Sequence, residues 1–247
     1  MKRSIQIFIF PVLLLLGLFA PESRAEMEAV DPAAKEILKR MTDYMGSVNQ
    51  FTFHTQNSLE DMLLSGHRID LDVSAKVTVS RPNKIRSERK GDRINQIFYY
   101  NGKILTLFNP DYNVYSTVEA PDTFYGLFKY LHESLGFGLP ITDLIHADAF
   151  PLLMEDVTLA RIIGKTYIDG TRCDHLLFSR PGVDFQVWVS DGSKPLPLKY
   201  VVTDTETPAR LSISTWMTDW NVDPLVDESQ FTFIRPDGAQ AIDFLPL

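Results

Sequence analysis

Residues 68 to 79 alternate between polar and apolar side chains almost without a fault, and this run limits the possible folds more than any other segment. Successive side chains of a strand point to opposite faces, so the pattern predicts one buried and one solvated face. At about 3.3 Å per residue the strand spans roughly 40 Å, far longer than the usual strand of about 5–6 residues. We therefore expect it to curl within a strongly bent sheet. The apolar face consists of Ile69, Leu71, Val73, Ala75, Val77 and Val79.

Turn sequences follow at short intervals along the rest of the chain. Asn101-Gly102 separates the apolar segments 94–100 and 103–108, and Asp169-Gly170 separates 158–168 from 171–179. Asp191-Gly192 ends the segment 183–190. Such pairs are typical of tight hairpins, because glycine and its neighbour accept the backbone angles that these turns need. The sheet is therefore expected to be antiparallel.

Two segments have helical rather than strand periodicity. Asp31-Pro32 is a helix start signal, and apolar residues then recur at spacings of three and four up to about Gly46. The segment 121–155 contains a second apolar face, formed by Phe124, Leu127, Phe128, Leu131 and Leu135, and a shorter one around Leu144. These helices either plug one face of the sheet as ordinary core or form a lid whose apolar face can exchange protein contacts for a ligand. The pattern leaves both interpretations open.

The N-terminus has the features of an export signal. Lys2 and Arg3 precede an apolar run, and Ser23-Arg24-Ala25 has small residues at the two positions that a signal peptidase reads. We expect residues 1–25 to be a signal peptide and residues 26–247 to be one periplasmic domain with no stable membrane span. The alternative is an N-terminal membrane anchor, but a span needs about 20 uninterrupted apolar residues and Pro11 breaks this run.

Charge and motifs exclude several functional classes. The chain has a net charge of −8, which argues against binding nucleic acid or an anionic membrane surface through clustered basic residues. No nucleotide-binding, hydrolase or zinc motif occurs, and Cys173, the only cysteine, cannot form an internal disulfide. Cys173-Asp174-His175 and His132-Glu133-Ser134 contain reactive residue types, but neither has the partners that catalysis or metal binding needs. We expect no enzyme activity, no catalytic or metal site and no cofactor.

Three tryptophans have an unusual placement. Trp188, Trp216 and Trp220 fall opposite the aliphatic rows of their strands. They either line a second apolar surface, which faces a cavity or a partner, or local bulges turn them into the core.

Several segments resemble a family of predicted periplasmic proteins of unknown function. They include Gly-Thr-Arg-Cys-Asp-His-Leu-Leu-Phe at 170–178, Pro-Leu-Pro-Leu-Lys-Tyr at 195–200, Arg-Pro-Asn-Lys-Ile-Arg at 81–86 and Phe-Thr-Phe-Ile-Arg-Pro-Asp-Gly-Ala at 231–239. That family is similar in architecture to the lipoprotein carriers LolA and LolB and to mycobacterial lipid carriers such as LppX. The resemblance implies an α+β, mainly β fold: a strongly curved antiparallel half-barrel covered by an N-terminal helix and by the helices at 121–155.

The same resemblance implies a binding function. We expect the half-barrel to hold an apolar small molecule, a lipid or a lipoprotein acyl chain. The alternative is a packed interaction module that binds an envelope protein through an exposed apolar face. The candidate ligand-binding residues are Leu71, Val73, Val77, Phe124, Leu127, Phe128, Leu131, Phe185 and Val187.

Overall fold

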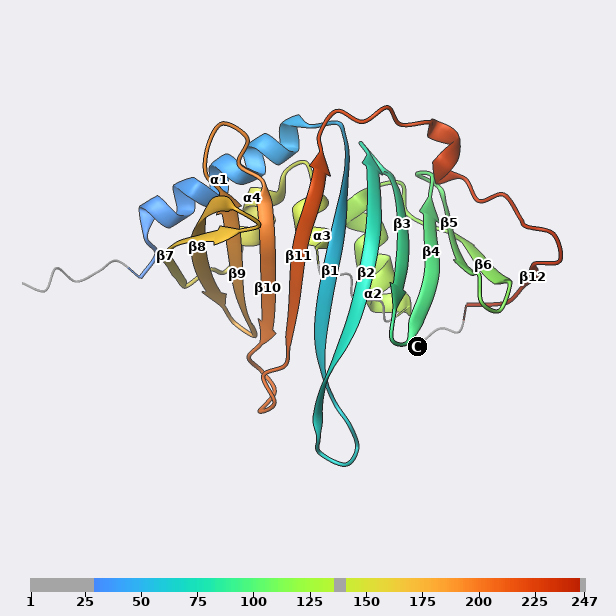
Figure 1. Ribbon diagram of the computed structural model, residues 1–247, viewed down its shortest axis with the longest axis horizontal. Coiled ribbons are helices and arrows are strands. Elements are labelled where there is room, and N and C mark those ends of the chain that lie inside the picture. The colour runs from blue at the N-terminus through green and yellow to red at the C-terminus, as the bar shows by residue number, and fades with distance from the viewer. Residues whose placement is uncertain (1–28, 136–140, 245–247) are drawn as a thin grey trace, which may run out of the picture.

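The computed structural model describes residues 29–135 and 141–244. Within them lies one sheet of twelve strands, with the helices α1 to α4 on one of its sides (Figure 1). Neighbouring strands are antiparallel, except that β12 runs parallel to β6. The expected mainly β, curved antiparallel architecture is confirmed. The expected signal peptide (1–25) and the Gly-Phe-Gly-Leu-Pro segment at 136–140 lie outside the described residues.

The strands follow the sheet in an order that places β1 and β2 near its middle. From one edge to the other they are β12 (Gln240–Ala241), β6 (Val114–Glu119), β5 (Ile104–Asn109), β4 (Ile94–Tyr100), β3 (Lys84–Gly91), β2 (Arg68–Ser80), β1 (Gln50–Met62), β11 (Ser212–Asn221), β10 (Pro197–Asp204), β9 (Val183–Ser190), β8 (Thr171–Arg180) and β7 (Leu159–Ile168). We call the face toward the helices the inner face and the opposite one the outer face.

The two strands in the middle of the sheet are each 13 residues long. The alternation predicted for β2 is present up to Val77: Val73 and Val77 are buried, while Asp70 and Asp72 are exposed. Beyond Val77 it is lost, because Thr78 and Ser80 are buried together with Val79. β1 pairs with β2 along its whole length, from Gln50 opposite Ser80 to Met62 opposite Arg68.

The first helix, α1 (Pro32–Ser47), begins where the sequence predicts. The Asp31 carboxylate accepts a 2.8 Å hydrogen bond from the Ala33 amide, which caps the helix. Its buried stripe includes Leu38, Met41 and Met45, and the helix packs on β7 and β9.

The remaining helices lie between β6 and β7, within the segment 121–155. They are α2 (Phe124–Leu135), α3 (Thr142–Ile145) and α4 (Ala149–Met154). A short 3-10 helix, η1 (Glu228–Phe231), precedes β12. α3 and α4 pack against α1 and against each other, so α1 and the inserted helices form one layer over the inner face.

Both edges of the sheet are paired with short segments of the same chain. Val30 forms a parallel bridge with Ala160 of the edge strand β7, and the Asp31 amide donates to the Ala160 carbonyl at 3.0 Å. At the other edge, the Gln240 amide donates to the Asn113 carbonyl and the Ile242 amide to the Tyr115 carbonyl, at 3.0 and 2.8 Å.

A bulge places one tryptophan differently from its neighbours. The pairing of β1 with β11 shifts between Thr52 and His54, and Asp219 adopts a positive φ of 53°. Trp220 is thereby turned onto the inner face, where its ring stacks on Phe53 with centroids 4.4 Å apart. Of the two alternatives for the tryptophans, the local bulge therefore applies to Trp220, whereas strict alternation would have placed it on the same face as Trp216.

Candidate ligand-binding site

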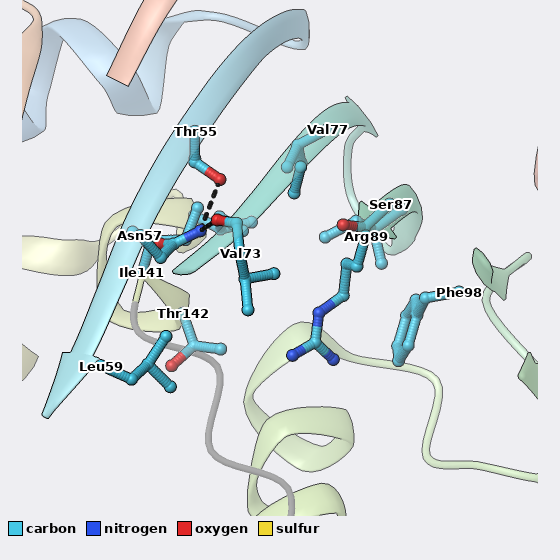
Figure 2. A pocket seen from close by; sticks show the side chains of 13 residues that line it. Thr55, Asn57, Leu59, Val73, Val77, Ser87, Arg89, Phe98, Ile141 and Thr142 are labelled. Atoms are coloured by element: carbon cyan, nitrogen blue, oxygen red, sulfur yellow. Dashed lines mark hydrogen bonds between the residues drawn. The ribbon is translucent and has the colours of Figure 1, made fainter. Parts of the chain in front are cut away.

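A cavity of about 60 Å³ lies between the inner face of β1 to β4 and the helix α3 (Figure 2). Its sheet wall is largely apolar and includes Val73, Val77, Ile85 and Phe98. Ile141 and Ile145 close it from the helical side. This volume is large enough for only a few water molecules, whereas pockets for drug-sized ligands measure about 300–1,000 Å³. A whole acyl chain thus requires the helices to move outward.

One polar group of the cavity wall belongs to a closed network. The Asn57 side-chain amide donates to the Thr55 hydroxyl at 2.9 Å and to the Val73 carbonyl at 2.8 Å. Thr215 of β11 donates its hydroxyl hydrogen to the Asn57 amide oxygen at 2.8 Å. These groups satisfy one another, so they join β1, β2 and β11 and are not offered to a ligand.

A second polar group, Arg89, has no such network. Its side chain extends from β3 into the space between Phe98 and Thr142 (Figure 2). Among the described residues, its guanidinium has neither a hydrogen-bond partner nor an ion-pair partner. It is half-buried, and desolvation lowers its pKa from 12.5.

Gln96 lies opposite Arg89 on β4. Its Oε1 is the one buried side-chain polar atom of the described residues that has no hydrogen-bond partner. Ser87, two residues before Arg89 on the same face, also lines the cavity. Unsatisfied polar groups are therefore concentrated at this cross-strand pair.

The predicted ligand-binding residues occupy three places. Val73 and Val77 line the cavity, and Leu71 is half-buried opposite Leu59, one inner-face position further along β2. The four residues of α2 are buried: Phe124, Leu127, Phe128 and Leu131. Phe185 and Val187 are buried on β9, which α1 covers, and do not line the cavity.

Arg81 connects the helical layer to the sheet. Its guanidinium donates to the carbonyl oxygens of Val48 at 2.9 Å and Met45 at 3.1 Å, and also to that of Ile145. Burial lowers its pKa to about 10. The hydroxyl of Tyr100 donates to the Pro121 carbonyl just before α2, and burial raises the pKa of Tyr100 to about 12. These hydrogen bonds connect the sheet to the C-terminal ends of α1 and α3 and to the residue at which the segment 121–155 begins.

A wider and more polar hollow of about 630 Å³ lies between α2, α3 and the end of β8. Lys129, Glu133, Asp143 and Arg180 contribute to its lining. His146, at the end of α3, also faces it and packs edge-on against Phe128 with ring centroids 5.5 Å apart. The mixed charges make this hollow a poor match for an apolar chain.

The cysteine, histidine and glutamate residues that the sequence analysis considered for catalysis or metal binding do not form a site. The Cys173 thiol is buried and donates to the Thr171 carbonyl at 3.4 Å, and burial raises its pKa. The His175 ring hydrogen-bonds to the Gln186 amide oxygen at 2.9 Å. His132 and Glu133 are exposed on α2. In the part of the chain that the structure describes, no group of His, Cys, Asp or Glu side chains is placed to hold a metal ion.

The outer face has its own aromatic row. The His175 ring stacks on Trp188 with centroids 4.0 Å apart. The Lys199 ammonium lies 4.7 Å from the Trp188 ring centre and 4.4 Å from that of Trp216. These four side chains cross strands β8 to β11 and are half-buried. Two of the three tryptophans thus lie on the outer face.

None of the helices within the described ranges combines the length and apolar character needed to cross a bilayer.

Comparison with solved structures finds proteins of similar fold at low sequence identity. An uncharacterized conserved protein from Thermus thermophilus superposes with a TM-score of 0.50 at 13% identity, over 85% of this chain and 99% of that one. Lipoprotein LppX from Mycobacterium tuberculosis gives a TM-score of 0.44 at 14% identity, over 78% and 100% of the two chains. A LolA superfamily protein from Nitrosomonas europaea gives 0.43 at 12% identity, over 81% and 97%.

Comparison with curated proteins finds no match. A family model, in contrast, matches residues 34–245, which is nearly all of the chain after the expected signal peptide. Its description places the family in the periplasm, in agreement with the N-terminal export pattern. The chain therefore belongs to the family described as predicted periplasmic protein (DUF2092).

Proposed function

We propose that this protein binds an apolar ligand, such as a lipid or a lipoprotein acyl chain, between the inner face of the sheet and its helices, and that it does so without catalysis. The observation that carries this proposal is the apolar cavity beneath α3. Its lining by Val73, Val77, Ile85 and Phe98 on one side and Ile145 on the other suits a hydrocarbon chain.

Binding in this proposal involves an exchange of apolar contacts. α2 turns the buried residues Phe124, Leu127, Phe128 and Leu131 toward the protein interior. A ligand chain that extends from the cavity beneath this helix replaces one set of apolar contacts with another, so most of the burial energy is retained. Each buried methylene contributes about 0.8 kcal/mol, which favours long chains over short ones.

The sequence suggested a larger site, which includes Leu71, Phe185 and Val187. In the proposal these residues contact the ligand only when the cavity extends along the inner face as the helices move. Leu71 lies toward one end of the sheet and β9 lies beneath α1.

The first experiment is to purify the protein from a bacterial periplasm and to compare its native and denatured masses, with extraction of released molecules into organic solvent. We expect a stoichiometric mass shift and a lipid in the extract. Delipidated protein is then titrated with monopalmitoylglycerol below its micelle concentration. Protein that carries no lipid and does not bind this probe contradicts the proposal.

Two neighbouring residues of β2 provide a matched pair of variants. Ala75 lines the cavity, and Lys76 is exposed on the outer face. Ala75→Phe fills the cavity and is expected to weaken monopalmitoylglycerol binding at least tenfold, whereas Lys76→Phe leaves it unchanged. Equal effects of the two substitutions would place the ligand elsewhere.

The aromatic row on the outer face supports a second candidate function, the binding of an envelope protein. Trp188, Lys199 and Trp216 form a continuous half-buried surface that the helices do not cover. Replacing both tryptophans by serine distinguishes the two functions. It abolishes capture of a partner from envelope extracts if this surface is the interface, and it leaves lipid binding intact if the ligand occupies the cavity.

A further inference from the structure

We infer that the ligand of the cavity carries an anionic group, a carboxylate or a phosphate, which pairs with Arg89. This inference rests on the proposed function and specifies its ligand class: an amphiphile with an apolar chain and an acidic head, rather than a neutral lipid.

The first argument is the placement of the charge. β3 alternates so that Ile85, Ser87 and Arg89 face inward, while Lys90 is exposed to solvent. Burial of a charged group without a partner is costly, so a strand with no ligand to bind would carry its basic side chains on the solvated outer face. Here a guanidinium shares the cavity wall with Val77 and Phe98.

The second argument is the lack of a protein partner. Guanidinium groups that lose water are normally paired with carboxylates or carbonyl oxygens. Arg81, also partly buried, illustrates this with its three carbonyl acceptors. Arg89 has none among the described residues, and no Asp or Glu lines the cavity. Neighbouring acidic residues such as Glu88 and Asp72 lie on the outer face.

The third argument is the second unsatisfied group beside it. Gln96 lies directly opposite Arg89 in the β3–β4 pairing, and its Oε1 is buried without a partner. An amide can rotate to present either its oxygen or its NH2 group. Arg89 and the Ser87 hydroxyl both line the cavity and can supply several donors to the oxygens of one anion, and the Gln96 amide lines the neighbouring hollow beside them.

These observations also predict the orientation of the ligand. Oxygens of the head accept from Arg89, and the chain follows the apolar wall toward Val77, Ile85 and Ile145. Planar guanidinium and carboxylate or phosphate oxygens can form two parallel hydrogen bonds, which fixes the head in one geometry. Away from bulk water such a pair is stronger than on the surface.

The test compares three probes that share a 16-carbon chain: palmitate, 1-palmitoyl-lysophosphatidate and the neutral monopalmitoylglycerol. Each is titrated into delipidated full-length mature protein below its micelle concentration at pH 8. We expect at least one anionic probe to bind tenfold or more tightly than the neutral one. Preference for palmitate or for lysophosphatidate identifies the anion as carboxylate or phosphate.

Two variants that each remove one positive charge test whether Arg89 causes the preference for anionic probes. Arg89→Met keeps an unbranched apolar side chain without the guanidinium and is expected to abolish the preference while leaving monopalmitoylglycerol affinity within about threefold. Lys90→Met removes a positive charge from the outer face of the same strand and is expected to change nothing. Arg89→Lys retains part of the preference, because it keeps the charge and loses the planar fork.

The outcomes are distinct. Equal affinity of the wild-type protein for all three probes overturns the anionic head but leaves the apolar-ligand proposal intact. If Arg89→Met lowers the affinity for all three probes equally, the anionic head is also overturned, because Arg89 then supports the structure of the site rather than binding the head. Failure of every probe to bind contradicts the proposed function itself. The wild-type comparison needs no variant, so the inference can be tested even if Arg89→Met does not fold.

Discussion

The Arg81 guanidinium donates a 3.1 Å hydrogen bond to the carbonyl oxygen of Met45, in the last turn of α1. The same side chain reaches the carbonyls of Val48 and Ile145, so one residue that follows β2 holds the ends of two helices. Helix ends leave carbonyl groups without intrahelical partners, and a cation is well suited to them.

Arg81→Ala should therefore destabilise the protein. Hydrogen bonds to charged groups contribute about 1.5–3 kcal/mol each in favourable cases, and loss of the shared donor leaves several carbonyls to water. We expect a loss of about 2–3 kcal/mol in the free energy of unfolding, measured by urea titration. Arg93, whose side chain is 58% exposed in its pair with Asp61, provides the control, and its alanine variant should be nearly neutral. Similar stability of both variants would contradict this role of Arg81.

Gly46 is a second point of close contact between helices. A Cβ built at this position lies 2.3 Å from the Ala147 carbonyl oxygen, which is backbone and cannot rotate away. Gly46→Ala must push α1 away from the link between α3 and α4, and we expect a clear drop in melting temperature. Gly164→Ala is the matched control, because a Cβ there meets no atom within 4 Å. A Gly46→Ala protein as stable as this control would show that the two segments separate without cost.

His146 should make the stability of the protein sensitive to mild acid. Burial lowers its pKa below 6.5, Asp143 opposes this shift, and Arg81 adds to it. The unfolded chain thus binds the proton more readily than the folded one. The contribution of His146 is fully present above about pH 6.5 and is lost as the pH falls toward the folded pKa.

The measurement is the melting temperature at pH 7.5 and 5.5 in the wild type and in His146→Gln. We expect a smaller loss on acidification in the variant, because the other titrating groups are common to both proteins. Identical losses would mean that His146 does not contribute.

Cys173 should be unreactive in the folded protein. Its thiol is buried and its pKa is raised by that burial, so little of the nucleophilic thiolate is present. A chromogenic disulfide reagent should react with it only after denaturation. Ser193→Cys, at an exposed position, provides the positive control and should react at once. Cys173→Ala should retain full ligand binding, and a loss of binding would implicate the thiol.

The periodic parts of the fold could be predicted from the sequence. The alternation in β2 and the capped start of α1 are both present, because burial of one face and a local cap determine these elements without help from distant residues. β1, its long neighbour, was not predicted. Its inner face continues from Phe51 and Phe53 into Thr55 and Asn57, polar side chains whose burial depends on hydrogen bonds to β2 and β11.

The candidate site was also predicted only in part, because local periodicity does not show which polar side chains face inward. Val73 and Val77 belong to a clear apolar face, whereas the segment from Lys84 to Lys90 has no alternation that would place Arg89 on the inner face. The sequence indicates the inward position of Arg89 only through its separation of four residues from Ile85, since residues an even number apart in a strand share a face. Trp220 was misplaced because the bulge at Asp219 depends on pairing with β1, which local periodicity does not contain.

An open sheet exposes a row of free N–H and C=O groups at each side, to which a strand of another molecule can add. This chain occupies part of both rows with its own ends, through Val30 beside β7 and through β12 beside β6. Closure into a full barrel would remove those edges but would also seal the inner face. Pairing the edges with short segments of the same chain instead protects the protein from polymerisation and leaves the inner face covered by helices rather than by further strands, so removing either segment should promote aggregation before it impairs binding.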